Sequence, residues 1–216
     1  MGTPESIVKG LNSGDPQSQS TLANLLGLTH FDPQQDFREC DIRSDDVKLD
    51  DSNDTSVLQV KCGYHMNIVV LRRHGAMSEP LDSQYLYAAY DRSQLDFASV
   101  IHPYAQEIIV HNAATVSGNL YEAYFLVLRL TKTRKLKVVL STLETGTEPR
   151  YGGTPRNQKS TFTITPASPT ESGEINQLAT IQVGSQSYTV RRVFEWSDEW
   201  QTFIEAGVQG IQSHRH

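Results

Sequence analysis

An acidic turn places three oxygen-bearing side chains at alternate positions directly before an apolar segment. Asp50, Ser52 and Asp54 are separated by single residues, and residues 56–62 read as the strand that follows the turn. A calcium ion takes roughly six to eight oxygen ligands, and a tight turn lets alternate side chains converge on it. The favoured interpretation is nevertheless a solvated acidic turn that holds no metal, so no cofactor is expected. Calcium held by Asp50, Ser52 and Asp54 is the alternative.

Aromatic residues near the C-terminus form a second candidate site. Tyr188 and Trp196 lie at the two ends of a predicted strand, and Trp200 follows a short turn at residues 197–199. A tryptophan at a corner between strands buries a large area, and its indole N–H needs a hydrogen-bond partner. One interpretation is an aromatic corner of the core. The functional interpretation is a platform on which a sugar ring stacks, with Tyr188, Trp196 and Trp200 as ligand-binding residues.

The two cysteines, Cys40 and Cys62, offer two further kinds of site. In an oxidising compartment they would form a disulfide, which stabilises a chain of this kind by about 3 kcal/mol in the chain-entropy model. Two buried free thiols are the alternative. Cys62 and His65 are also spaced as two zinc ligands on one turn, with Cys40 as a third, but a structural zinc site normally takes four ligands.

The sequence lacks the usual motifs of a catalyst. It contains no Gly-x-Ser-x-Gly segment, no phosphate-binding glycine loop and no His-Glu-x-x-His pair. Glu122 stands in an apolar segment, where burial would raise its pKa. More often, such a residue lies on the wet face of an edge strand. We therefore expect a protein that is not an enzyme, and no catalytic residue is assigned.

The composition limits the classes of partner. The 216 residues carry a formal net charge of −6, and the densest basic run is confined to residues 132–137. A nucleic-acid surface needs concentrated basic residues, so we expect no nucleic-acid partner. No stretch approaches the roughly 20 consecutive apolar residues that span a bilayer, so we expect no membrane span. The polar residues are mostly Ser, Thr, Gln and Asn, which favours an exported protein.

The expected localisation is therefore secreted or periplasmic. Residues 1–10 lack the apolar centre of a signal peptide. This leaves a mature form in which Met1-Gly2 replaces a leader, or a cytoplasmic protein as the alternative. The surface composition fits the first better.

Two helices and a series of strands must position these residues. Thr3 and Asp15 are each followed by a proline, the pattern of a helix cap and first turn, and Gly27 is a natural stop. Residues 3–27 therefore predict a helical hairpin. Residues 50–205 read as an antiparallel β core, whose clearest hairpin joins residues 178–183 to residues 188–196. Residues 121–131 read as a central strand, with a helix as the competing assignment.

These elements predict a mainly β fold with a small helical fringe. We expect one domain over residues 1–216, built as an antiparallel sandwich or a blade-like stack of sheets rather than a closed barrel. The tail after Gly207 is expected to fray.

Two short segments resemble known proteins. The acidic turn resembles a degraded form of the Asp-x-Asp-x-Asp-Gly calcium loops in the FG-GAP and VCBS-type repeats of extracellular β-proteins, with Ser52 in place of the middle carboxylate and Thr55 in place of the glycine. Residues 188–200 resemble the ending of many uncharacterised exported bacterial β-domains, in which a strand, a tryptophan, an acidic turn and an aromatic residue follow one another.

The resemblance implies an exported or periplasmic binding or interaction module of the lipoprotein kind, with a saccharide or a protein as its partner. One alternative is a hydrolase that acts on an extracellular polymer through paired carboxylates in a cleft. Another is a structural or immunity-like protein whose acidic face binds a basic partner.

Overall fold

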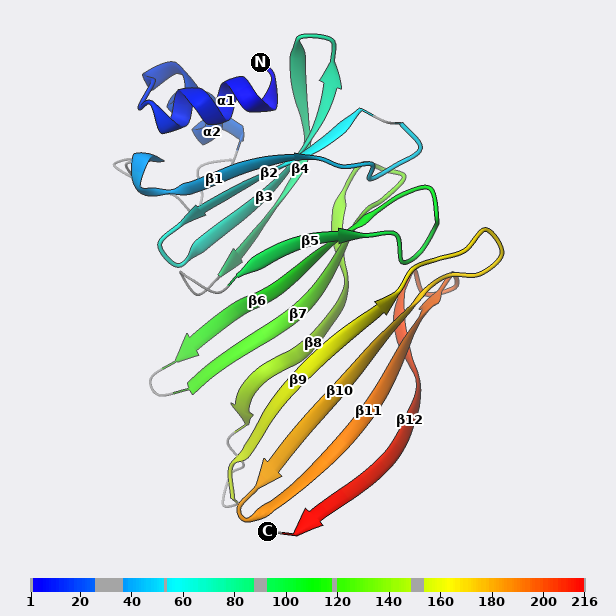
Figure 1. The fold of residues 1–216 in the computed structure, drawn as a ribbon. Helices are drawn as coiled ribbons and strands as arrows, with labels where there is room; N and C mark the ends of the chain where they lie inside the picture. Colours follow the sequence, from blue (N-terminus) through cyan, green and yellow to red (C-terminus); the bar gives the residue numbers. More distant parts are fainter. Residues whose placement is uncertain are drawn as a thin grey trace. The chain divides into compact units, whose positions relative to one another are not determined.

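The computed structural model describes residues 2–25, 37–52, 54–87, 93–117, 120–148 and 154–215. It confirms the predicted fold class, because two antiparallel sheets make up most of it and two short helices stand at its N-terminal end (Figure 1). One sheet has four strands and the other has eight. In the strand order of each sheet, the first and last strands are edges that do not pair with each other.

The chain forms two compact units. The first contains Met1–Asp91 and Leu130–Lys137, and the second contains Arg92–Arg129 and Val138–His216. The single domain expected from the sequence stays a prediction. The strands begin before and end beyond the predicted range 50–205.

The two helices of the first unit start as their sequences predict. In α1 (Pro4–Asn12), the Thr3 side chain accepts a hydrogen bond from the Ser6 N–H, and α2 (Pro16–Leu25) starts beside Asp15, whose carboxylate accepts the Ser18 N–H at 2.8 Å. These bonds satisfy helix N–H groups that have no partner within the helix. The predicted stop at Gly27 lies outside the described residues. In the part of the chain that is described, no helix is both long enough and apolar enough to cross a membrane.

One inner strand of the four-stranded sheet is buried along its whole length. The sheet runs in the order β1 (Asp41–Asp46), β2 (Thr55–Cys62), β3 (His65–His74) and β4 (Met77–Tyr87), after a short 3-10 helix, η1 (Phe37–Glu39). Every residue of β2 is buried. Leu58 and Val60 of β2 share a core cluster with Ile7 and Leu11 of α1. The apolar face of α1 therefore packs against this sheet.

The eight-stranded sheet of the second unit is a meander in which each strand pairs with the next (Figure 1). Its strands are β5 (Gln94–Ala98), β6 (Glu107–Ser117), β7 (Leu120–Leu130), β8 (Leu136–Glu148), β9 (Arg156–Thr165), β10 (Glu174–Val183), β11 (Gln186–Ser197) and β12 (Thr202–Arg215). Residues 121–130 of the stretch 121–131 therefore form a strand, β7, and not a helix. The tail expected to fray after Gly207 instead continues β12, because its backbone pairs with β11 as far as Arg215.

One face of this sheet carries the core of the second unit. Residues of β10 alternate between buried and exposed, and the buried Ile175 pairs with Ile164 of β9 and Phe194 of β11. Together with Phe125 and Phe203 they belong to one apolar cluster. Because side chains alternate along a strand, Trp196 lies on the same face as Phe194, at the end of this core.

Candidate functional site

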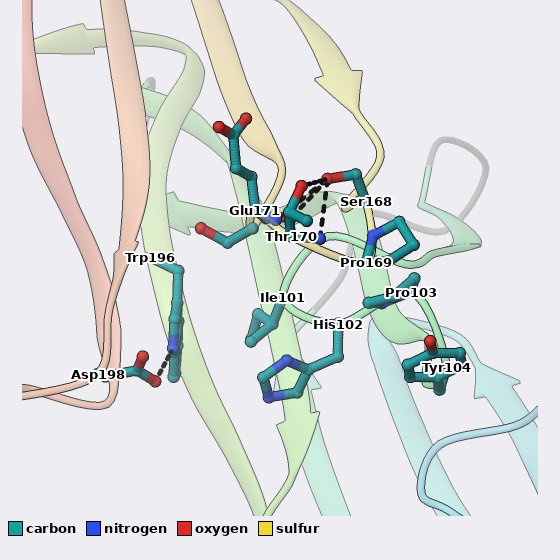
Figure 2. Close-up of a pocket in the computed structure, with 11 residues that line it drawn as sticks. Ile101, His102, Pro103, Tyr104, Ser168, Pro169, Thr170, Glu171, Trp196 and Asp198 are labelled. Atoms are coloured by element: carbon teal, nitrogen blue, oxygen red, sulfur yellow. Dashed lines mark hydrogen bonds between the residues drawn. The ribbon is translucent and has the colours of Figure 1, made fainter.

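A pocket of about 260 Å³ lies at this end of the second unit. Three segments line it: the loop between β5 and β6, the loop between β9 and β10, and the end of β11 (Figure 2). Figure 2 shows Trp196 and Asp198 on one side, with His102 and Tyr104 on the other. The indole of Trp196 is seen edge-on there, with one face turned toward the side on which His102 lies.

The backbone of residues 99–101 holds the two loops together. The carbonyl of Ser99 accepts the Ala167 N–H, and the carbonyl of Val100 accepts the Gly173 N–H, both at 2.7 Å. Gly173 is required at this contact, since a Cβ atom there would stand 2.1 Å from the carbonyl oxygen of Thr165. The loop at residues 166–173 is thus fixed at both ends to one short segment.

Glu107 holds the same segment from its other side. The carboxylate Oε2 accepts the backbone N–H of Val100 at 2.8 Å and that of Ile101 at 3.2 Å. Glu107 is only 2% exposed, and this burial raises its pKa to about 7, although both N–H groups and the nearby Arg129 favour the charged form. A carboxyl that ionises near neutral pH therefore lies directly beneath the pocket loop.

Trp196 forms the aromatic wall of the pocket. Its indole N–H donates to the Asp198 carboxylate at 2.9 Å, and its ring contacts Phe203 edge-on with 5.5 Å between ring centres. The Arg129 guanidinium lies over the ring, 4.8 Å from its centre. These three contacts fix the orientation of the ring, and a cation over an indole face is a favourable arrangement.

The remaining wall of the pocket is polar. In the loop 166–173, the Ser168 hydroxyl accepts the Glu171 N–H at 3.0 Å, which folds the loop into a tight turn (Figure 2). The side chains of Thr170, Glu171 and Ser172 line the pocket with that of Asp198. The pocket therefore combines an aromatic ring with hydroxyl groups and two carboxylates, a set that binds a small polar ligand with an apolar face.

The structure brings one of the three predicted aromatic residues into the pocket. Trp196 lines it, whereas Trp200 lies in the turn after β11 and is 68% exposed. Tyr188 lies at the opposite end of β11, where it pairs with Ile181 and donates to Gln186. The three residues do not form one platform.

The acidic turn is held by an arginine. Asp50 accepts hydrogen bonds from the N–H and hydroxyl of Ser52, and its other carboxylate oxygen is paired with Arg72 of β3. The Asp54 side chain is exposed, and its carbonyl accepts the Arg73 N–H. Across the described ranges, no three His, Cys, Asp or Glu side chains are grouped so that they could hold a metal ion. The geometry thus favours the structural interpretation of this turn.

Cys40 and Cys62 are joined by a disulfide, which confirms that sequence expectation. Cys40 immediately precedes β1 and Cys62 ends β2, and their Cα atoms lie 4.5 Å apart. The alternative zinc site at Cys40, Cys62 and His65 is therefore wrong, because a disulfide sulfur is not a thiolate ligand. The His65 ring instead bonds the Tyr85 hydroxyl.

Among the described residues, the buried carboxyl is Glu107 rather than Glu122. Glu122 is half-buried on the interior strand β7 and accepts the Tyr124 hydroxyl at 2.6 Å. Sequence reasoning missed Glu107, His102, Arg129 and Asp198. The only local signal was a carboxylate directly before the apolar run Ile108–Val110, and its partners lie on loops that no spacing rule connects.

The comparisons with known proteins add no relative from which a role for this pocket could be taken. No protein-family model matches the chain, no curated protein matches it, and no solved structure matches it.

Proposed function

We propose that this protein is a non-enzymatic binding module of an exported compartment, and that its ligand is a saccharide bound in the pocket beside Trp196. The observation that carries the proposal is the meeting of an aromatic ring with hydroxyl and carboxylate groups in one small pocket. A sugar ring has an apolar face that stacks on an indole and a rim of hydroxyl groups that bond to oxygen and nitrogen atoms.

The size and charge of the pocket narrow the class of saccharide. Ligand pockets for drug-sized molecules have volumes of roughly 300–1,000 Å³. At about 260 Å³, this pocket suits a single sugar ring, such as the end of a longer chain. Glu171 and Asp198 both line it. Their charges disfavour acidic sugars and favour neutral or amino sugars.

The disulfide supports the proposed compartment. Disulfides form and persist in secreted and periplasmic proteins, whereas the cytosol keeps thiols reduced. Cys40–Cys62 ties the edge strand β1 to β2. An exported module that meets extracellular saccharides is consistent with such a bond.

A titration with simple sugars tests the proposal. Glucose, galactose, glucosamine and N-acetylglucosamine would each be added to the ¹⁵N-labelled protein while the Trp196 indole N–H signal is followed. We expect at least one sugar to shift that signal in a saturable way. Trp196→Ala should weaken binding about tenfold or more, because the stacking surface is lost.

Trp200→Ala and Tyr188→Ala are the matched controls, since both remove an aromatic side chain of the same unit outside the pocket. We expect both to bind as the parent does. If none of the sugars perturbs Trp196, or if the two controls lose binding as Trp196→Ala does, the pocket is not the saccharide site.

A second candidate function is hydrolysis of a glycosidic bond. Its support is that two carboxylates, Glu171 and Asp198, line one pocket, as a pair of acids does in most glycosidases. Against it, an oxygen of Asp198 is occupied by the Trp196 indole N–H. Release of nitrophenol from nitrophenyl glycosides, lost in both Glu171→Gln and Asp198→Asn, would establish the hydrolase and overturn the non-enzymatic proposal.

The alternative of a basic protein partner has weaker support. Glu5 and Asp46 are both paired with Arg73, and Asp50 is paired with Arg72. These arginines neutralise part of the acidic surface that a basic partner would meet.

A further inference from the structure

Glu107 is connected to both walls of the pocket. Its carboxylate accepts the N–H groups of Val100 and Ile101, which precede His102 on the loop wall. Its charge also attracts that of Arg129, whose guanidinium lies over the Trp196 ring. One buried carboxyl therefore touches the loop directly and reaches the aromatic wall through a single side chain.

The strand register explains this connection. Ile108 of β6 pairs with Leu128 of β7, so the preceding Glu107 and the following Arg129 lie opposite each other. On the other flank, Glu107 pairs with Ala98 at the end of β5. The short loop that leaves β5 then turns back over the carboxylate, which places its N–H groups within bonding distance.

We propose that Glu107 is a positioning residue that couples the geometry of the pocket to proton binding. Ionised Glu107 holds residues 100–101 through charge-assisted hydrogen bonds, which are about twice as strong as neutral ones, and its charge attracts the Arg129 guanidinium. Protonated Glu107 holds both walls more weakly. This regulation rests on the proposed function for its effect on ligand affinity, and on the contacts of Glu107 alone for its effect on the pocket.

Near neutral pH, the protonated and the ionised forms of Glu107 are both populated, because burial raises its pKa to about 7. Arg129 is the charged group that faces it from β7. Ala98 faces it from β5, and the loop presents the backbone N–H groups of Val100 and Ile101. His102, Tyr104, Glu171 and Asp198 are the titratable groups that line the adjoining pocket.

A pH titration by NMR, without any ligand, tests the coupling. The backbone N–H signals of Val100 and Ile101 and the indole N–H signal of Trp196 would be followed from about pH 5 to about pH 9. We expect all three to move together with one midpoint near 7. Glu107→Gln should abolish that common titration, because the amide keeps an acceptor oxygen and cannot ionise.

Two variants separate Glu107 from other acids and bases. Glu122→Gln changes a half-buried carboxylate elsewhere in the same unit and should leave the titration unchanged. His102→Gln removes the imidazole that lines the pocket. A common titration that disappears in His102→Gln, or that survives in Glu107→Gln, overturns the proposal.

The second measurement is affinity for glucose and N-acetylglucosamine, whose own charge does not change with pH, at about pH 5.5 and about pH 8.5. We expect binding about three- to tenfold tighter at the higher pH in the parent, and equal at the two values in Glu107→Gln. His102→Gln should keep the difference. If sugars fail to bind while the three N–H signals titrate together, the proposed function fails and the proton coupling stands. If sugars bind without the common titration, the coupling fails alone.

Discussion

The backbone N–H of Gly173 donates a 2.7 Å hydrogen bond to the carbonyl of Val100, and this contact joins two loops that are about seventy residues apart in the chain. The carbonyl of Ser99 makes a second such bond with Ala167. The Glu107 carboxylate accepts the N–H groups of Val100 and Ile101. The segment 99–101 is therefore hydrogen-bonded both to Glu107 and to the loop at residues 166–173. The shape of the pocket therefore depends on the close approach of the two loop backbones.

Gly173→Ala should loosen this contact. A Cβ atom at this position would lie 2.1 Å from the Thr165 carbonyl oxygen, so the backbone would have to move. We expect the free energy of unfolding to fall by about 1–3 kcal/mol, the usual cost of overpacking, as measured by urea denaturation. Gly207→Ala is the control, since no atom lies within 4 Å of its Cβ position. Equal effects of the two substitutions would contradict this account.

The stability of the protein should depend on the ionisation of Glu107. Folding raises the pKa of Glu107 from 4.5 to about 7, so the folded state binds this proton more tightly than the unfolded state does. The contribution is fully present below about pH 4.5 and is lost as the pH rises through about 7, on the order of 3 kcal/mol in total. Glu107→Gln should therefore gain stability relative to the parent as the pH rises.

Urea unfolding of both proteins across this pH window measures that difference. Glu122→Gln is again the control and should follow the parent at every pH. A constant difference in stability between Glu107→Gln and the parent from about pH 4.5 to about pH 8 would show that Glu107 titrates alike in both states.

Trp196→Ala should destabilise the fold, whereas Trp200→Ala should not. Trp196 is half-buried against Phe203 and Arg129, while Trp200 is 68% exposed. We expect a loss of about 2–3 kcal/mol for Trp196→Ala, somewhat below the cost for a fully buried tryptophan, and less than about 0.5 kcal/mol for Trp200→Ala. Thermal unfolding monitored by circular dichroism would reveal a reversed order if this assignment were wrong.

Reduction of Cys40–Cys62 should lower the melting temperature. The bond closes a loop between residues 22 apart in sequence, and its loss should cost about 3 kcal/mol in the chain-entropy model. Mass spectrometry should show the intact protein gaining two hydrogen atoms on reduction. Cys40→Ser with Cys62→Ser should melt like the reduced parent, and reductant should not affect this variant further.

Calcium should leave the protein unchanged, and Asp50→Ala should destabilise it. The Asp50 carboxylate is paired with Arg72, whose side chain is only 14% exposed. Removing the carboxylate leaves that guanidinium without this partner, at a cost of about 1.5–3 kcal/mol. Calorimetric titration with calcium tests the first expectation, and a saturable heat that disappears in Asp50→Ala would restore the calcium interpretation.

The hairpin β10–β11 shows what could be predicted from the sequence. Alternating residues on each strand and a turn at Gly184 and Ser185 are local signals, and Gly184 has the positive φ, 59°, that its turn needs. The caps at Thr3 and Asp15 are equally local. Such features follow from neighbours along the chain, and the structure confirms each of them.

The pocket depends on contacts that are distant along the chain. Glu107 gains its role from Val100 and Ile101, which a loop turns back over it, and from Arg129 on the next strand. Trp196 was singled out by its residue type, but its separation from Tyr188 and Trp200 required the strand register. The β12 tail was missed because its residues carry little apolar signal, and a backbone ladder holds it in place.

The disulfide also protects a sheet edge. It fastens β1, the outer strand of the four-stranded sheet, to β2, whose residues are buried along their whole length. If the bond were broken and β1 detached, the apolar strand β2 would become an edge with unpaired backbone N–H and C=O groups. Such an edge can pair with a strand of another molecule and lead to aggregation. Keeping the cysteines oxidised would then guard against self-association as well as unfolding.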